Sequence, residues 1–535
     1  MHGVKGFRLK WILPVMILAI MLKGGDSLAQ AQQKEQYPKP VYPRYLVNPS
    51  KAKLLDAARL AVRQVYGRAP LGKLQKGQTV HVFLQWQQDP QVWEAIKDAW
   101  AERGVTAVAI PAWTLPGMTE PEMKEWAKTN LIYGQDGWKE IGVFEPDYIP
   151  FLPDEMQKTF GQQWSDLFMW RNIGAYFDKH PEIKFYLAGI GGRTFAQGLA
   201  GERHKNKVQL GNWIYESPQE LLSKFGGFPG DVWSLIDDRM VAPVPHVSEG
   251  TFTDPEGTNL HWTLTPEQTR HWAEQVSDYT EGHLQVYPAA SMATWKSGVI
   301  RAASNHTGFQ PVMTVNISEH GRVTKIEGGG KTGDVFRMLL EHPKLKNAKF
   351  PTAPEPGYWY LNQDGFGTNP KAVRDVEFLR RGTQTWANMS ERNRAGVQHF
   401  SFSHPSAGRS DPKDQAYAKA NGYPLKHTMH MHVFFPTVKY KLADTGEWIT
   451  ISDKGYIAPL NDPEVRALAA KYGDPNLLLR YEWIPDIPGV NVPGDHEKDY
   501  SPDPWGYIIK QWAKIQAGTY EYYGEDYAMK AGSQQ

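Results

Sequence analysis

The amino-acid sequence predicts a mixed α/β protein: an α/β N-terminal domain built on a parallel sheet, followed by a β-rich α+β C-terminal domain. Two observations carry this prediction. Between residues 51 and 110, helix-like and strand-like segments alternate, which favours parallel strands joined by helices. After residue 245, short strand-like segments separated by glycine turns follow one another instead. The chain has 535 residues, 41% of them hydrophobic, so it can form several packed domains.

The elements of the first domain follow from local patterns. Residues 51–66 have the apolar spacing of a helix, and residues 79–84 (TVHVFL) form a strand-like run. A helix is expected over 89–103, because an aspartate at its N-cap position is followed by proline. Further strands are expected at 105–110 and 183–190. A strand–helix–strand unit of this kind predicts a parallel sheet.

The remaining boundaries follow from changes in character along the chain. A proline-rich stretch near residue 245 separates the α/β domain, 51–245, from a predicted catalytic domain, 246–437. Residues 438–535 are expected to be an extension packed on that domain, either as a lid or as a homodimer interface. Strands in the second domain are expected at 312–318, 322–327, 397–403 and 431–437.

The N-terminus is typical of an export signal. Basic residues precede a short apolar run over 11–22, and residues 29–31 (AQA) form a small-x-small cleavage site, so 1–31 is predicted to be a secretory signal. The alternative is an uncleaved anchor, which would be the chain's only association with a membrane. Residues 32–50 are rich in proline and tyrosine and are expected to form a linker or arm. A secreted or periplasmic protein is therefore expected.

Composition excludes several function classes. Lys and Arg number 59 and Asp and Glu 58, which argues against binding nucleic acid through bulk charge. The mean hydropathy is negative, which excludes a polytopic membrane protein. The chain has no cysteine, so thiolate metal sites and cysteine nucleophiles are excluded. Any metal must therefore be held by His, Asp, Glu or main-chain oxygen.

The strongest chemical signal is the segment 426–437 (KHTMHMHVFFPT). If its second half is a strand, His430 and His432 project on one face and can occupy neighbouring positions on one metal ion. His427 is expected in the preceding turn. The alternative is a pair of structural histidines that form hydrogen bonds on a polar sheet face.

A second group of candidates lies on other segments. In 397–404 (VQHFSFSH), His399 shares a strand face with two serines, and His404 ends the strand. His399 could reach a metal shared with His430 and His432. Glu281 and His283 follow a helix-like stretch at 266–279.

Six phrases, taken in order, resemble the thermophilic metalloaminopeptidase family of the aminopeptidase T and S type. They are 254–259 (DPEGTN), 281–288 (EGHLQVYP), 321–329 (GRVTKIEGG), 365–370 (GFGTNP), 397–402 (VQHFSF) and 430–434 (HMHVF). The resemblance implies a Rossmann-like N-terminal domain and a β-rich metal-binding C-terminal domain.

The metal ligands implied by this resemblance are altered. The family's two metal-binding glutamates fall on His283 and Gln363, its histidines on His399 and His430, and its final aspartate on His432. Two dications about 3.5–4 Å apart need bridging carboxylates, which this set lacks. The chain is also similar to 2,5-dihydroxypyridine ring-opening dioxygenases, whose Fe(II) ligands would correspond to His283, His430 and His432.

Three functions follow as hypotheses. The first is an exported ring-opening dioxygenase with one Fe(II), acting on a small hydroxylated aromatic or enolic compound, with His399 or His404 as acid/base. The second is a Zn(II) hydrolase, such as an aminopeptidase or amidase, with Glu281 or Asp364 as general base. The third is a binding protein without catalysis.

Overall fold

In the computed structural model, all of the described residues belong to one compact unit, residues 37–535. The predicted signal, 1–31, therefore falls outside the described residues. The described residues are 37–47, 49–67, 69–129, 146–163, 172–188, 200–211, 214–276, 282–288, 293–306, 308–362, 365–380, 388, 390–405, 411–425 and 429–530. Among them, no helix has both the length and the apolar character needed to span a bilayer.

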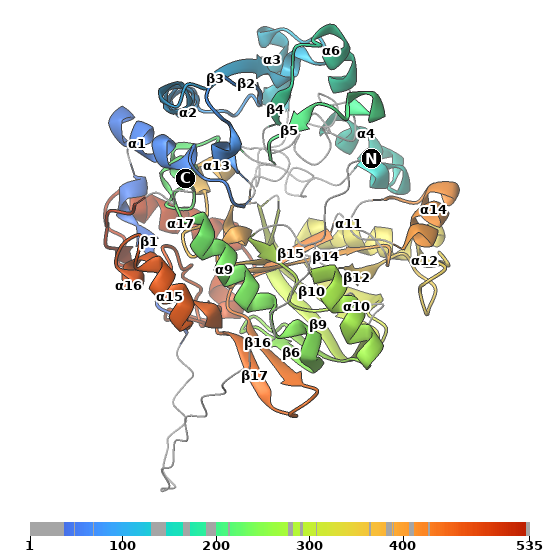
Figure 1. Ribbon diagram of the computed structural model, residues 1–535. Coiled ribbons are helices and arrows are strands. Elements are labelled where there is room, and N and C mark those ends of the chain that lie inside the picture. The colour runs from blue at the N-terminus through green and yellow to red at the C-terminus, as the bar shows by residue number, and fades with distance from the viewer. Residues whose placement is uncertain are drawn as a thin grey trace, which may run out of the picture. The chain divides into compact units, whose positions relative to one another are not determined.

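A four-stranded parallel sheet forms the predicted α/β part. Its strands run in the order β3-β2-β4-β5, and every neighbouring pair is parallel (Figure 1). The bounds are β2 Thr79–Leu84, β3 Thr106–Pro111, β4 Phe185–Ala188 and β5 Val208–Gln209. Helix α2, Pro90–Glu102, joins β2 to β3, and the Asp89 carboxylate accepts hydrogen bonds from the first-turn amides as its N-cap. The predicted strand–helix–strand unit is confirmed.

Most of the remaining strands belong to one antiparallel sheet, which has 13 strands among the described residues. Its main path is β18-β17-β16-β6-β7-β9-β15-β14-β13-β8, with β10 and β11 branching from β9 and β12 pairing with β14. The bounds of its strands are β6 Val247–Thr253, β7 Asn259–Thr263, β8 His283–Leu284, β9 Thr294–Asn305, β10 Gly308–Ile317, β11 Val323–Gly328, β12 Tyr360–Asn362, β13 Phe366–Gly367, β14 Gln398–Ser403, β15 Met429–Val433, β16 Thr437–Leu442, β17 Trp448–Asp453 and β18 Tyr456–Ile457. A mixed α/β fold is therefore what the chain adopts.

Two of these strands correct the expected bounds. The segment 431–437, expected as one strand, is divided between β15 and β16, which pair with different neighbours. Pro436 lies between them, and proline lacks the N–H that a continuous ladder would need. Strand β16 pairs with β6, so residues beyond 437 extend the same sheet.

Helices pack along the sheets and bring distant segments together. Helix α9, Gly230–Val241, carries Trp233, whose indole N–H donates to the Thr368 hydroxyl at 2.8 Å. The other principal helices are α1 Lys51–Ala61, α10 Pro266–Val276, α11 Gly330–Glu341, α14 Pro412–Asn421, α15 Pro463–Ala469 and α17 Pro504–Gln516. One continuous apolar core includes residues of both sheets.

Candidate metal centre

Five buried histidines meet where β8, β14 and β15 lie beside the turn that follows β9. Antiparallel pairing sets His399 of β14 opposite His432 of β15, and Ser401 opposite His430. Side chains alternate along a strand, so His430 and His432 lie on the same face. None of the five side chains is more than 3% exposed; they are His283, His306, His399, His430 and His432.

Three of these imidazoles form the closest group. Ligand nitrogens of His306, His399 and His430 all lie within 4.8 Å of one another. His306 occupies the turn between β9 and β10, and its ring centroid is 3.8 Å from that of His430. The ring of His432 lies 5.1 Å from that of His306. The hairpin turn therefore completes a cluster that the two strands begin.

His283 is held against His399 from the other side. Its Nε2 is 2.6 Å from Nδ1 of His399, so the two rings share one proton in a hydrogen bond. Gly365 allows this approach, because a Cβ there would lie 1.8 Å from the His283 ring. Gly282 precedes His283 with a φ of 74°, and its N–H donates to the Asp237 carboxylate at 2.7 Å. These contacts fix β8 at the cluster.

A buried carboxylate orients His432. Nδ1 of His432 is 2.7 Å from Oε1 of Glu391, so a proton on Nδ1 leaves Nε2 as the basic nitrogen of the ring. The other carboxylate oxygen accepts from Arg374 Nε at 2.7 Å. Burial would raise the pKa of Glu391, but the charge of Arg374 and the hydrogen bond to His432 outweigh it and hold that pKa below its usual range. Glu391 is therefore an anion that hydrogen-bonds His432.

Arg392, unlike Arg374, forms a hydrogen bond with a histidine of the cluster. Nη1 of Arg392 donates to Nε2 of His306 at 2.6 Å and lies 3.4 Å from Nε2 of His399. Burial, together with the nearby His430 and Arg392, lowers the pKa of His306 well below its usual value. His306 is therefore a neutral imidazole, which is the form that binds metals.

The donor set could bind a transition-metal ion. Metal–nitrogen bonds of about 2.0–2.1 Å place the ligand nitrogens of a tetrahedral site about 3.4 Å apart, so nitrogens that lie within 4.8 Å of one another would move closer by up to about 1.4 Å on binding one ion. Imidazole suits Zn, Cu, Fe and Ni alike. Among the described residues, Glu391 supplies the carboxylate next to the cluster, where it is hydrogen-bonded to His432. The group could therefore hold a metal, and it lacks a described bridging carboxylate for a second.

The predicted residues are placed as follows. His283, His399, His430 and His432 are all in the cluster. His404 lies at the end of β14, where its buried ring stacks on Phe350 with centroids 5.3 Å apart. The other candidates lie outside the described residues; they are Glu281, Gln363, Asp364 and His427.

Sequence reasoning missed three residues of the centre: His306, Glu391 and Arg392. His306 follows Asn305 at a hairpin turn, and a single histidine in a turn carries no periodic signal. Glu391 and Arg392 lie in a 3-10 turn, Glu391–Asn393, whose charges look exposed in the sequence but are buried. The surrounding residues 388–394 (NMSERNR) are mostly polar, so no local pattern marks this pair as buried.

The chain is similar at low identity to solved structures, two of which are described below. No protein family matches the sequence, and no curated protein matches it. Among solved structures, 2,5-dihydroxypyridine dioxygenase from Pseudomonas putida is 16% identical with a TM-score of 0.34, covering 78% of this chain and 99% of its own. Wild-type AmpT from Thermus thermophilus is 14% identical with a TM-score of 0.39, covering 76% and 99%. At this low identity, neither assigns the chain to a family.

Proposed function

We propose that the chain is a metal-dependent enzyme that binds one divalent ion at the histidine cluster, and that it opens the ring of a small hydroxylated aromatic or enolic compound. The observation that carries the proposal is the close group of His306, His399 and His430. His432, oriented by Glu391, and His283, bonded to His399, are within reach as alternative ligands. Fe(II) is the proposed ion, and when bound it would supply chelation of the substrate and activation of O2.

The charges around the cluster favour an anionic substrate. Three neutral imidazoles leave the charge of a divalent ion uncompensated, and Arg392 adds a buried guanidinium beside His306. Guanidinium groups bind oxyanions with charge-assisted hydrogen bonds. Arg392 is therefore proposed to bind the deprotonated hydroxyl or a carboxylate of the substrate.

The protein's own proton-transfer groups lie beside this position. The hydrogen bond between His283 and His399 joins two imidazoles, so one can accept a proton while the other releases one. Burial of both rings excludes bulk water. His399 is accordingly proposed as a ligand or as acid/base, while His404 and Glu281 remain candidates from the sequence.

A Zn(II) hydrolase is the second candidate, because three histidines are also the donor set of catalytic zinc sites that lower the pKa of bound water. Such an enzyme needs a general base. Glu391 is already bonded to Arg374 and His432, and it is poorly suited to that role. Glu281 or Asp364 would have to supply the base. A binding protein without catalysis is the third reading.

Metal analysis tests the proposal. The protein should be purified with and without oxygen, and the metal content of His306→Ala, His399→Ala and His430→Ala compared with that of His320→Ala, a half-exposed turn residue outside the cluster. One iron per chain, lost in the three variants and kept in the control, supports the dioxygenase and justifies an O2-uptake screen with hydroxylated aromatics. One zinc favours the hydrolase, two metals favour an aminopeptidase, and no metal contradicts the proposal.

Two further expectations are proposed with it. We propose that the parallel sheet is a Rossmann-like, doubly wound domain, since its strand order reverses beside β2. We also propose that the chain is exported; mass spectrometry of the mature N-terminus from a native producer tests this.

A further inference from the structure

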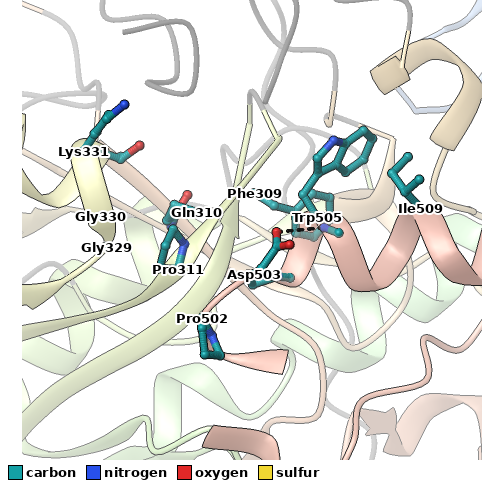
Figure 2. A pocket seen from close by; sticks show the side chains of 13 residues that line it. Phe309, Gln310, Pro311, Gly329, Gly330, Lys331, Pro502, Asp503, Trp505 and Ile509 are labelled. Atoms are coloured by element: carbon teal, nitrogen blue, oxygen red, sulfur yellow. Dashed lines mark hydrogen bonds between the residues drawn. The ribbon is translucent and has the colours of Figure 1, made fainter. Parts of the chain in front are cut away.

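A cavity separate from the histidine rings opens between the start of β10 and the N-terminal ends of α11 and α17 (Figure 2). Its volume is about 720 Å³, which is in the usual range for a small-molecule site. Neither the metal ligands proposed above nor Glu391 and Arg392 line it. Its two ends differ in chemical character, and the difference indicates what it would bind.

One end is formed by the N-terminus of α11. Gly329 is the N-cap with a left-handed φ of 75°, so no side chain caps this helix. The flanking residues Gly328 and Gly330 are also left-handed, at 66° and 51°. Amides at a helix N-terminus attract anions, and Lys331 at the second helical position adds a positive charge.

A buried amide group lies between the two ends. Gln310 is 3% exposed and lines the cavity, and Figure 2 shows it between Lys331 and Trp505. Its orientation is determined: the Gly308 N–H donates to Asn305 Oδ1 at 3.1 Å, so Asn305 Nδ2 donates to Gln310 Oε1 at 2.7 Å. Nε2 of Gln310 then has no acceptor among the described residues. A buried donor in this state costs free energy unless a ligand supplies the acceptor.

The other end is flat and apolar. Trp505 stacks on Phe309 with ring centroids 5.9 Å apart and an interplanar angle of 17°, and Ile509 lies one turn further along α17 (Figure 2). Asp503 caps α17 by accepting from the Gly506 N–H at 2.9 Å. This helix end is already compensated, and the Asp503 charge would repel a second anion. The anionic group of a ligand is therefore directed to α11.

We propose that this cavity binds a small aromatic compound that carries a carboxylate or phosphate group. The oxyanion lies at the uncapped end of α11 beside Lys331, and Nε2 of Gln310, which has no acceptor among the described residues, is a further donor in the wall of the cavity. The ring lies against Trp505 and Ile509. This proposal does not depend on the function proposed for the histidine cluster.

Calorimetric titration of the full chain tests the proposal with four probes: phenyl phosphate, benzoate, inorganic phosphate and benzyl alcohol. The variants are Lys331→Gln, which removes the charge, and Trp505→Leu, which removes the ring. Lys325→Gln is the matched control, because Lys325 is exposed on β11 outside the cavity. Thermal unfolding of each variant checks that it is folded. Ile509→Glu, which adds a carboxylate to the lining of the cavity, provides a second test.

Phenyl phosphate or benzoate is expected to bind at one site per chain and benzyl alcohol to bind at least tenfold more weakly. Lys331→Gln should weaken phenyl phosphate and inorganic phosphate by about tenfold. Trp505→Leu should weaken phenyl phosphate by a similar factor but leave inorganic phosphate unchanged, and Ile509→Glu should weaken both aromatic anions. The proposal is overturned if neither aromatic anion binds, or if binding is the same in these variants as in Lys325→Gln, since the anion would then occupy another site.

Discussion

Replacing Glu391 by glutamine tests whether a buried carboxylate organises the candidate metal centre. Glu391 is fully buried; Oε1 contacts His432 and Asn388, each at 2.7 Å, and Oε2 accepts from Arg374 at 2.7 Å. An amide keeps the shape of the side chain but removes its charge. The buried Arg374 guanidinium would then lose its counter-ion, and His432 would lose the acceptor that holds its proton on Nδ1.

The magnitude follows from these contacts. Removing one partner of a buried ion pair costs about 3–5 kcal/mol, and the hydrogen bonds that an amide can keep place Glu391→Gln at about 3 kcal/mol. Where His432 serves as a ligand, loss of its outer partner Glu391 should lower metal affinity by about 10–100-fold. The stabilisation is also pH-dependent. The pKa of Glu391 is held below its usual range, so the stabilisation is present above about pH 4 and is lost as the pH falls through the lower folded-state pKa.

The assay is urea unfolding with and without metal, together with a metal titration. Glu327→Gln is the control, because Glu327 is exposed and pairs with Lys325 on the surface, where such pairs contribute at most about 1 kcal/mol. The reasoning is refuted if Glu391→Gln unfolds within about 0.5 kcal/mol of the parent and binds metal with unchanged affinity.

Three further results are expected. Gly365→Ala should lower the free energy of unfolding by about 1–3 kcal/mol and reduce metal binding, because the added Cβ would overlap the His283 ring. Urea unfolding and metal content measure the two effects. Full metal content in the variant would contradict the geometry. Burial raises the pKa of Asp237 to about 7, so between about pH 4 and pH 7 the folded protein keeps a proton that the unfolded chain releases. The free energy of unfolding should therefore fall by up to about 4 kcal/mol as the pH rises through this range. Asp237→Asn should flatten that slope in unfolding measured across this pH range, and an unchanged slope would exclude the assignment. Arg392→Gln should raise metal affinity, because it removes a donor that competes with the metal for His306. The same variant should weaken binding of anionic catechol-type compounds. Equal binding of neutral and anionic compounds by the parent would oppose a role for Arg392 in binding the anion.

The sequence predicted those parts of the fold that depend on local signals. The Asp89 cap and its following proline define the start of α2, and the apolar run before it is β2. His430 and His432 were recognisable because strand alternation puts them on one face.

Other features depend on contacts between distant segments. His306 joins the cluster only because the β9–β10 hairpin brings its turn to β14 and β15. Glu391 and Arg392 are buried by packing that no local pattern reports. Pro436 could have indicated the break between β15 and β16, since it cannot donate within a ladder.

The branched pairing of the large sheet has a consequence for folding. Strand β9 pairs with β7, β10 and β15, and the close histidines come from positions 306, 399 and 430, so the site exists only after long chain segments have closed. A metal ion present at 1,000 times its Kd would add about 4 kcal/mol to the free energy of unfolding of the strands that form the site. Amide exchange in β9, β14 and β15 would then slow together on metal binding, as one cooperative unit.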